Sequence, residues 1–403
     1  MNKTRPTKKR TTRFPRKNNT AFSGKRGHTK KKKNESTLDP NSLVMEASDG
    51  LSNSYQPSRT FNEMPLHAKL KSNIDRMGFT LPTQIQEESL EQLKAEHDLV
   101  GVANTGTGKT GAFLIPIIDQ LLNEPKSAQS LVIVPTRELA KQVEDEFRSL
   151  AKGTDIYVSS FIGGTSVGRD IKKLKKHNDL LIGTPGRLLD LANRGFLKLE
   201  NITNLVLDEF DRMLDMGFVN DIKQMVRTMH NRKQTMLFSA TIDHTQQSLI
   251  NELLDNPAEV KVSKSSLASG QIEQDIIRVP QDGDKFSMLV DLLNGAGFDK
   301  VLIFVETKRL VDQVSKKLRQ SGIKADLIHG DKTQSYRTNA LDKFKKGKVQ
   351  VLVATDVAAR GIDVTDISHV INYQLPINYE SYLHRIGRTG RAGKSGKAFT
   401  FVD

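Results

Sequence analysis

Short apolar runs alternate with amphipathic, helix-forming stretches over most of the chain. The first series of apolar runs covers residues 99–102, 131–134, 157–161, 180–182, 205–207 and 236–238. Strands buried on both faces show continuous apolar runs, and helices between them are the usual crossovers of a parallel sheet. The pattern therefore predicts an α/β fold in which helices cover both faces of a mostly parallel sheet.

A second series of apolar runs follows at residues 276–279, 301–305, 325–328, 351–354, 370–373 and 398–402. The stretch between the two series, residues 262–271, contains four Ser and one Gly and is typical of a flexible joint. The sequence thus predicts two tandem domains of the same α/β type. We expect them at residues 59–262 and 272–403, joined by a linker at 263–271.

The net charge of +14 comes entirely from the N-terminal end of the chain. Residues 1–33 hold 14 Lys or Arg and no Asp or Glu, whereas the other 370 residues hold 47 residues of each sign. Such a basic, low-complexity segment is predicted to be disordered, and residues 1–58 together form a predicted tail and linker. The tail is either an auxiliary arm that binds phosphates without sequence specificity or a solubilising or address segment.

Residues 103–110, A-N-T-G-T-G-K-T, connect an apolar run to a predicted helix through a glycine turn. In such a turn the backbone N–H groups and the helix dipole attract phosphates, Lys109 can reach the terminal phosphates, and the Thr110 hydroxyl can bind Mg²⁺. Ala103 replaces the first Gly of the usual pattern, so a chance glycine turn is the alternative. Only the first domain carries such a stretch, which predicts a single nucleotide-binding loop.

Four polar motifs stand at or just after the ends of apolar runs in the first series. They are P-T-R-E-L-A at 135–140, T-P-G-R at 184–187, D-E-F-D at 208–211 and S-A-T at 239–241. Because ligands bind at the carboxyl ends of parallel strands, we expect these motifs to share one active face. Asp208 would hold Mg²⁺ and Glu209 would orient or deprotonate the attacking water, which predicts metal-assisted hydrolysis.

The second domain carries three arginines at a spacing of three residues, namely Arg385, Arg388 and Arg391. Guanidinium groups bind phosphate oxygens bidentately and stabilise the negative charge that develops in phosphoryl transfer. The spacing alone leaves two interpretations open. One is a solvated basic face, and the other is a set of arginine fingers that reach across a cleft.

Composition excludes several other kinds of site. The chain has no Cys, which excludes disulfides and thiolate metal sites, and its nine His show no zinc-binding spacing. No apolar run approaches the ~18 residues of a membrane span, and no signal-peptide core follows the basic N-terminus. We expect a monomeric cytoplasmic protein without membrane contact, with a nuclear or nucleolar location as the alternative for a eukaryotic source.

Together the motifs resemble those of the DEAD-box RNA helicases of helicase superfamily 2, and the resemblance covers residues 61–403. In family order the chain contains A-x-T-G-x-G-K-T, P-T-R-E-L-A, the glycine pair 163–164, T-P-G-R, D-E-x-D, S-A-T, H-G-x-x-x-Q-x-x-R at 329–337, A-T-D-x-A-A-R-G-I-D at 354–363 and H-R-I-G-R-T-G-R at 384–391. A segment at 78–86 resembles the Q motif. The resemblance implies two tandem RecA-like domains, each a mostly parallel sheet covered by helices, and an RNA-stimulated ATPase that uses ATP and Mg²⁺.

The resemblance also implies roles for individual residues. Catalysis would fall to Lys109, Asp208, Glu209, Arg388 and Arg391, with Thr110 and Asp208 on the metal. ATP would be bound by the adenine-stacking Phe61, the adenine-reading Gln86, the loop residues Thr105, Gly106, Thr107, Gly108, Lys109 and Thr110, and the ribose-contacting Asp363. Coupling of the nucleotide site to domain closure would use Asp211, Ser239, Thr241 and His384. For Gln86, which lies three residues after Thr83, ordinary capping of a helix is the alternative.

RNA is the partner that the resemblance implies. Its sugar-phosphate backbone would follow Thr136, Arg137, Gly164, Thr184, Arg187, Gly330 and Thr355. Small and hydroxyl-bearing residues let a backbone approach closely, and contacts to phosphate and sugar carry no base information. We therefore expect sequence-independent RNA binding, with contacts to the 2′-OH as the means of excluding DNA.

Three positions depart from the family pattern: Phe210 replaces the Ala of D-E-A-D, Gln84 replaces the second Pro of the Q motif, and Gln374 replaces a common Asp. Our leading hypothesis is an ATP-dependent RNA helicase that unwinds short duplexes locally in RNA metabolism, whether in ribosome assembly, RNA decay or RNA remodelling. An ATP-gated RNA clamp or annealing protein with little turnover is one alternative, for which Phe210 leaves room. A DNA-directed translocase is the other.

Overall fold

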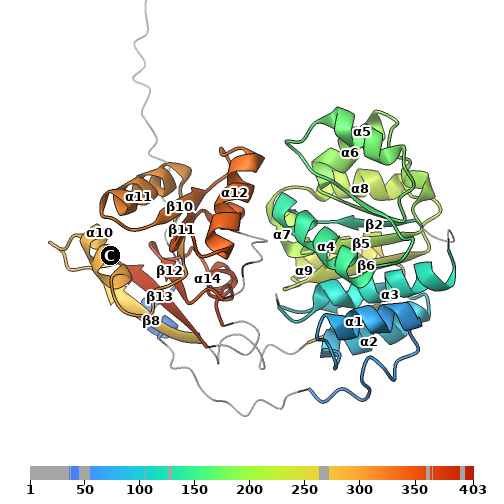
Figure 1. Ribbon diagram of the computed structural model, residues 1–403, viewed down its shortest axis with the longest axis horizontal. Helices are drawn as coiled ribbons and strands as arrows, with labels where there is room; N and C mark the ends of the chain where they lie inside the picture. Colours follow the sequence, from blue (N-terminus) through green and yellow to red (C-terminus); the bar gives the residue numbers. More distant parts are fainter. Residues whose placement is uncertain are drawn as a thin grey trace, which may run out of the picture. The chain divides into compact units, whose positions relative to one another are not determined.

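The computed structural model describes residues 36, 38–44, 55–104, 106–125, 129–262, 272–359, 364, 366–390 and 395–403. These residues form two parallel sheets, each with helices packed on both faces (Figure 1). The predicted linker at 263–271 and the basic residues 1–33 lie outside the described residues. None of the helices in the described part of the chain is long and apolar enough to cross a membrane.

The first sheet has seven parallel strands in the order β3-β4-β2-β5-β6-β1-β7. Their bounds are β1 (Leu99–Val102), β2 (Ser130–Ile133), β3 (Val158–Phe161), β4 (Leu180–Gly183), β5 (Asn204–Asp208), β6 (Gln234–Ser239) and β7 (Ala258–Lys261). The apolar runs predict the first six of these. Only Val260 is buried in the edge strand β7, so β7 has no apolar run to reveal it.

Successive residues of a strand point to opposite faces, so each central strand of this sheet contributes to two cores. In β5, Val206 packs in one core, whereas Leu205 and Leu207 pack in the other. The first core is covered by α1 (Ala68–Arg76), α2 (Gln84–Lys94), α3 (Lys109–Asn123) and α4 (Arg137–Leu150). The second is covered by α5 (Val167–Leu174), α6 (Pro185–Asn193), η2 (Leu199–Asn201), α7 (Phe210–Asp215), α8 (Val219–Thr228) and α9 (His244–Leu253).

The second sheet has six parallel strands in the order β10-β11-β9-β12-β13-β8. They are β8 (Ile272–Arg278), β9 (Val301–Phe304), β10 (Ala325–Ile328), β11 (Val351–Ala354), β12 (His369–Asn372) and β13 (Gly396–Val402). One face is covered by α10 (Lys285–Leu293) and α11 (Lys308–Gln320), the other by α12 (Gln334–Lys345), α13 (Asp356–Ala359) and α14 (Tyr379–Ile386). The predicted fold class, two parallel sheets covered by helices, is confirmed.

The structure differs from the predicted disordered tail and linker in part of residues 38–58. Pro40–Leu43 forms a short 3-10 helix, η1, and the side chain of Leu43 is buried. Tyr55 and Ser58 hydrogen-bond to the carboxylate of Glu87 in α2. The sequence of η1 shows no hydrophobic periodicity, because Leu43 is its one buried residue. Order therefore begins before Phe61.

Candidate nucleotide site and nucleic-acid interface

The strand order of the first sheet divides its carboxyl edge into two halves. The ends of β1, β5 and β6 are neighbours and carry the glycine loop, the D-E-F-D motif and the S-A-T motif. The ends of β3, β4 and β2 are neighbours and carry the glycine pair, T-P-G-R and P-T-R-E-L-A. One edge of a single sheet thus brings all of these predicted motifs of the first domain together, as expected for a parallel sheet.

The glycine loop connects β1 directly to the N-terminus of α3. Gly106 and Gly108 have φ angles of 87° and 92°, in the left-handed region where only Gly is unstrained. A Cβ atom at Gly108 would also approach the Gln86 amide nitrogen to 2.6 Å. The Thr107 hydroxyl donates to the carbonyl of Asn104 at 2.8 Å, which fixes the turn. The loop therefore presents the amino end of a 15-residue helix, a favourable position for an anion.

Lys109, the first residue of α3, is buried, and among the described residues its ammonium nitrogen has no hydrogen-bond partner. A buried ammonium group without a hydrogen-bond acceptor is costly, and native structures rarely retain one without a ligand that supplies the acceptor. Lys109 lowers the pKa of Asp208, although burial, the larger effect, raises that pKa to about 7. The arrangement combines a cationic group and a carboxyl group in a buried, polar position beside the loop.

Glu209 follows Asp208 at the end of β5 and adopts a left-handed conformation with φ 55°. Its backbone N–H donates to Asp208 Oδ1 at 2.9 Å, and its carboxylate accepts from Arg212 Nη1 at 2.6 Å. Burial alone would raise the pKa of Glu209, but Arg212 and Lys109 outweigh it and hold the pKa below its ordinary value. Glu209 is thus an ionised, oriented carboxylate on a strained backbone, a combination found at functional sites.

Sequence reasoning missed Arg212, although a signal was available. It directly follows D-E-F-D, and a spacing of three residues on a helix brings Arg212 onto Glu209. Both side chains are almost fully buried. Arg212 therefore fixes the position of the Glu209 carboxylate and supplies its counter-charge.

The predicted coupling residues of the first domain form one hydrogen-bonded chain. The Asp211 backbone N–H donates to Ser239 Oγ at 3.3 Å, and Ser239 Oγ donates to the carbonyl of Thr241 at 2.6 Å. These two hydrogen bonds join the start of α7 to the loop after β6. Phe210 points away from it into the core between the sheet and α6–α9, where it is fully buried. The core of the first domain thus accommodates the larger side chain that stands where the family has Ala.

Gln86 and Phe61 differ in how they fit their predicted roles. The Gln86 amide accepts from the Thr83 backbone N–H at 3.0 Å and donates to the carbonyl of Gly108 at 3.1 Å. It therefore caps α2, as the alternative interpretation has it, and also contacts the glycine loop. The Phe61 ring is buried in the first core at 4% exposure, so in this conformation it offers no open face to a base. Gln84 hydrogen-bonds Glu88 one turn later at 2.9 Å, which Pro could not do.

On the other half of the edge, two arginines lie against the loop after β3. Gly164 has a φ of 78°, and a Cβ atom there would approach the Arg137 guanidinium to 2.4 Å. Arg187 donates to the carbonyl of Thr165 at 2.6 Å and pairs with Asp170 at 3.4 Å. Thr136 and Thr184 precede α4 and α6 as N-caps. This half of the carboxyl edge, at the ends of β3, β4 and β2, therefore carries arginines, threonines and helix N-termini, which are groups that bind a phosphate backbone.

The predicted site residues Gly330 and Thr355 of the second domain also lie just after the carboxyl ends of strands. Gly330 follows β10, and Thr355 follows β11 immediately before α13. Arg388 and His384 come from the end of α14 and the turn after it, where Arg388 Nε donates to the carbonyl of His384 at 3.4 Å. Thr105, Asp363 and Arg391 lie outside the described residues, so their predicted roles stay predictions.

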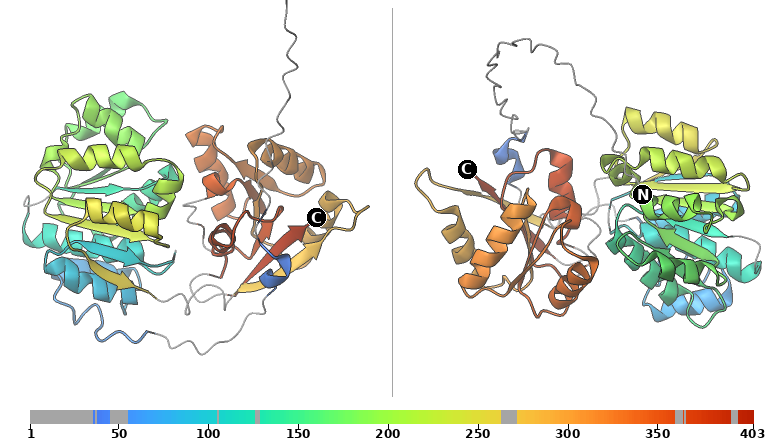
Figure 2. Two further views of the ribbon diagram at one scale, coloured as in Figure 1. Left: turned by 180° about the vertical axis from the view of Figure 1, so that it is seen from behind. Right: turned by 90° about the horizontal axis from the view of Figure 1, so that it is seen from above.

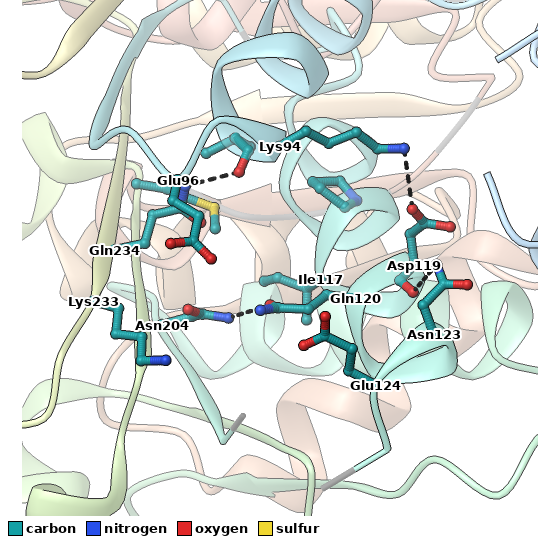
Figure 3. A pocket seen from close by; sticks show the side chains of 13 residues that line it. Lys94, Glu96, Ile117, Asp119, Gln120, Asn123, Glu124, Asn204, Lys233 and Gln234 are labelled. Atoms are coloured by element: carbon teal, nitrogen blue, oxygen red, sulfur yellow. Dashed lines mark hydrogen bonds and ion pairs between the residues drawn. The ribbon is translucent and has the colours of Figure 1, made fainter. Parts of the chain in front are cut away.

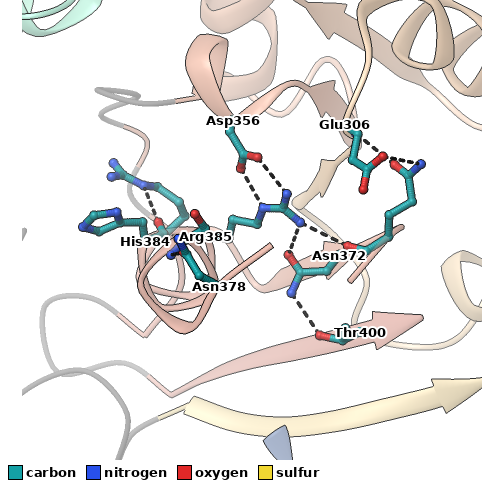
Figure 4. A network of polar contacts seen from close by, with 10 residues as sticks. Glu306, Asp356, Asn372, Asn378, His384, Arg385 and Thr400 are labelled. Carbon is teal, nitrogen blue, oxygen red and sulfur yellow. Dashed lines mark hydrogen bonds and ion pairs between the residues drawn. The ribbon is translucent and has the colours of Figure 1, made fainter. Parts of the chain in front are cut away.

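Arg385 is the centre of a buried polar network that the arginine spacing did not reveal (Figure 4). Its guanidinium makes two hydrogen bonds to the carboxylate of Asp356, at 2.6 and 2.7 Å, and further bonds to Asn372 and to the carbonyl of Gln374. It also lies over the ring of Phe304, 5.4 Å from the centroid. The interpretation of a solvated basic face is wrong for Arg385 and Arg388, because both side chains are buried.

Gln374 closes this network toward β9. Its side-chain carbonyl accepts from the backbone N–H of Glu306 at 2.9 Å. An Asp side chain, one methylene shorter, would not span the same gap. The departure from the family pattern at this position therefore has a local structural reason.

A pocket of about 220 Å³ lies at the opposite, amino-terminal edge of the first sheet (Figure 3). Its polar side chains pair with one another: Asn204 donates to Gln120 at 2.8 Å, and Lys94 pairs with Asp119 at 3.3 Å. It contains none of the predicted site residues. The chemistry is therefore concentrated at the carboxyl edge.

The fold and the site define an α/β protein of the nucleotide-binding type with two tandem sheets. The family model of the DEAD/DEAH box helicases matches residues 83–249, and that of the helicase conserved C-terminal domain matches residues 284–393. The ATP-dependent RNA helicase CshA of Listeria monocytogenes is 43% identical over 342 residues, which cover 85% of this chain and 66% of the relative. The chain belongs to the DEAD-box helicase family.

Two further comparisons agree with this assignment. The DEAD-box ATP-dependent RNA helicase CshA of Bacillus subtilis is 43% identical over 85% of this chain and 69% of the relative, so the chain spans about two thirds of the length of these relatives. The structure of Saccharomyces cerevisiae Dbp5 bound to RNA and ADP BeF3 is similar with a TM-score of 0.77 and 32% identity, covering 86% of this chain and 90% of that chain. The two sheets are therefore two tandem RecA-like domains, as predicted.

Proposed function

We propose that the protein couples ATP binding and hydrolysis to sequence-independent RNA binding and to local unwinding of short duplexes in RNA metabolism. The observation that carries this proposal is the buried Lys109 ammonium group, which has no hydrogen-bond partner within the described residues and lies at the amino end of α3. A nucleotide phosphate would supply the missing hydrogen-bond acceptor. The relatives CshA and Dbp5 support ATP as the nucleotide and RNA as the polymer.

In the proposed reaction each residue has a defined task. The glycine loop and Lys109 bind the phosphates, and the ionised Glu209 orients the attacking water and accepts its proton. Mg²⁺, when bound by Asp208, Thr110 and phosphate oxygens, would neutralise phosphate charge and bring the pKa of Asp208 back down. Arg388 and Arg391 would stabilise the developing charge as arginine fingers.

The RNA half of the edge belongs to the same proposal. Arg137, Arg187, Thr136 and Thr184 would bind the sugar-phosphate backbone, and Gly164 leaves room for it beside Arg137. The hydrogen bonds through Ser239 join Asp211 to Thr241 within the nucleotide half, and the shared sheet connects this half to the RNA half. Coupling would therefore require closure of the two domains on both ligands, with His384 contributing from the second domain.

The test is steady-state ATP hydrolysis by the full chain with no polymer, with single-stranded RNA and with DNA of the same sequence. We expect RNA to stimulate hydrolysis and DNA to do so much less, and we expect a short labelled RNA duplex to come apart only with ATP. Low, RNA-independent hydrolysis together with annealing that disappears when residues 1–33 are deleted would favour the clamp. Equal stimulation by RNA and DNA would favour the translocase.

Replacing Lys109 with Ala is expected to lower kcat/KM for ATP by about 100-fold, because one charge-assisted hydrogen bond to phosphate is worth up to about 3 kcal/mol. The measurement is RNA-stimulated ATP hydrolysis, with nucleotide affinity followed by a fluorescent ATP analogue. Lys198→Ala, which changes an exposed lysine of the same domain, serves as the control and should behave like the unaltered protein. Undiminished hydrolysis by Lys109→Ala would contradict the assignment of the loop.

Replacing Gly164 with Ala is expected to weaken RNA binding by about tenfold through loss of one charge-assisted contact, because the added Cβ displaces the Arg137 guanidinium. Gly195→Ala is a matched control: its φ of 74° imposes similar backbone strain, but its Cβ meets no atom within 4 Å. Fluorescence anisotropy of labelled single-stranded RNA measures the affinity. Equal affinities of the two variants would show that the Arg137 position does not matter for RNA.

A further inference from the structure

An apolar surface on the second domain is covered by a segment from the N-terminal end of the chain. Ile272 of β8, Ala398 of β13, and Tyr382 and Ile386 of α14 form one buried cluster with Leu43 of η1. Leu43 is 1% exposed, whereas the neighbouring Val44 is 52% exposed. In Figures 1 and 2 the short blue helix of residues 40–43 lies beside β8. Leu43 therefore completes the core at this edge of the second sheet.

Polar contacts fix the same segment in one register. Asp39 caps η1 by accepting from the Asn41 backbone N–H at 3.0 Å, and Pro40 occupies the first helical position. The Asn41 side chain accepts from Arg278 Nη2 at 2.5 Å, and Ser36 Oγ donates to the carbonyl of Pro376 at 2.5 Å. The contact of Asn41 with Arg278 joins residues that are 237 positions apart in the chain, and that of Ser36 with Pro376 joins residues 340 positions apart. A combination of one buried anchor and directed polar contacts is specific rather than adventitious.

The chain returns to the first domain at residues 55–58. The Tyr55 hydroxyl donates to Glu87 Oε2 at 2.6 Å, and the Ser58 backbone N–H donates to the same oxygen at 3.1 Å. Glu87 lies in α2 and is buried. The chain is thus held on the second domain up to residue 44 and on the first domain from residue 55.

We propose that residues 36 and 38–44 form a strap that fastens the second domain to the segment preceding the first domain. The domains are then connected by two links: residues 45–54, which join the non-covalently docked strap to the first domain, and residues 263–271, which connect the domains covalently. The first link sets a maximum distance between Val44 and Tyr55 of about 40 Å, since eleven residue steps span at most ~3.6 Å each. A second link reduces the number of separated arrangements and so favours re-closure of the domains.

Docking of the strap can be tested independently of any activity, because the chain has no Cys. We expect the thiol of Leu43→Cys in the full chain to react with a soluble disulfide reagent at least tenfold more slowly than the thiol of Val44→Cys. Because the smaller Cys side chain fills less of the buried cluster than Leu43 does, a second pair of variants, Leu43→Asp and Val44→Asp, tests docking without a cysteine. Leu43→Asp should increase hydrogen exchange in α14, and Val44→Asp should not. Equal thiol reactivity, or equal exchange in the aspartate pair, would overturn the proposal.

The effect of the strap on closure rests on the proposed function. In RNA-stimulated ATP hydrolysis we expect Leu43→Asp to raise the RNA concentration for half-maximal rate about threefold over Val44→Asp, the size of effect that a loop-closure term produces. The maximal rate should be the same in both. An unchanged half-maximal concentration would overturn the effect on closure. Absence of RNA stimulation in the unaltered protein would instead contradict the proposed function and leave the thiol test valid.

Discussion

Replacing Glu209 with Gln is expected to lower kcat for RNA-stimulated ATP hydrolysis by about 10³-fold, the range that a positioned general base contributes. Gln has nearly the same shape but neither accepts a proton nor carries the charge that Arg212 and Lys109 stabilise at this position. Nucleotide and RNA affinities should change little, because the phosphates are bound by the loop and by Lys109. Single-turnover hydrolysis with saturating RNA measures the chemical step separately from product release.

Two controls separate this loss from a loss of structure. Glu200→Gln changes an exposed carboxylate of η2 in the same domain and should leave hydrolysis unchanged. Because Glu209→Gln removes the ionic partner of the buried Arg212, thermal unfolding must show that the variant is still folded at the assay temperature. A folded Glu209→Gln protein that hydrolyses ATP at more than a tenth of the normal rate would exclude Glu209 as the base.

The first-domain site was largely predictable because its residues follow buried strands. A run such as 205–207 shows where β5 lies, and a parallel sheet then dictates that Asp208 and Lys109 meet at one edge. The left-handed conformation of Glu209 was not predictable in the same way, since nothing in D-E-F-D distinguishes it from an ordinary helix start. It accompanies two short-range contacts of Glu209, the hydrogen bond to Asp208 and the ion pair with Arg212, which form at the buried end of β5.

The second domain shows the opposite case. Three arginines with equal spacing look equivalent in the sequence, yet Arg385 is buried in a polar network and Arg388 lies in the turn after the helix. The difference arises because α14 ends at Ile386, so that Arg385 lies in its last turn beside Asp356, whereas Arg388 lies two residues beyond the helix. Burial of Leu43 was not predictable either. A run of three apolar residues, Leu43-Val44-Met45, does not indicate which of them is buried until the surface formed by Ile272, Tyr382, Ile386 and Ala398 is present to receive it.

Replacing Arg385 with Ala is expected to lower the free energy of unfolding of the second domain by about 3 kcal/mol, the lower end of the cost of breaking a buried ion pair. We choose the lower end because the Asp356 side chain keeps 31% exposure and can be partly hydrated once Arg385 is gone. The change also leaves Asn372 and the carbonyl of Gln374 without a donor. Urea unfolding followed by circular dichroism measures the loss.

Arg385→Lys tests whether geometry or charge carries this stability. An ammonium group cannot reproduce the two parallel hydrogen bonds to Asp356, so we expect Lys to recover no more than half of the loss. Arg309→Ala, at an exposed position of α11, is the control and should unfold like the unaltered protein. If Arg385→Ala unfolds at the same urea concentration as the unaltered protein, the network does not hold α14 in place. If its free energy of unfolding falls as expected, the rate of ATP hydrolysis should fall as well, because α14 leads directly to Arg388. A fall in rate that parallels the loss of stability would mark Arg385 as a positioning residue.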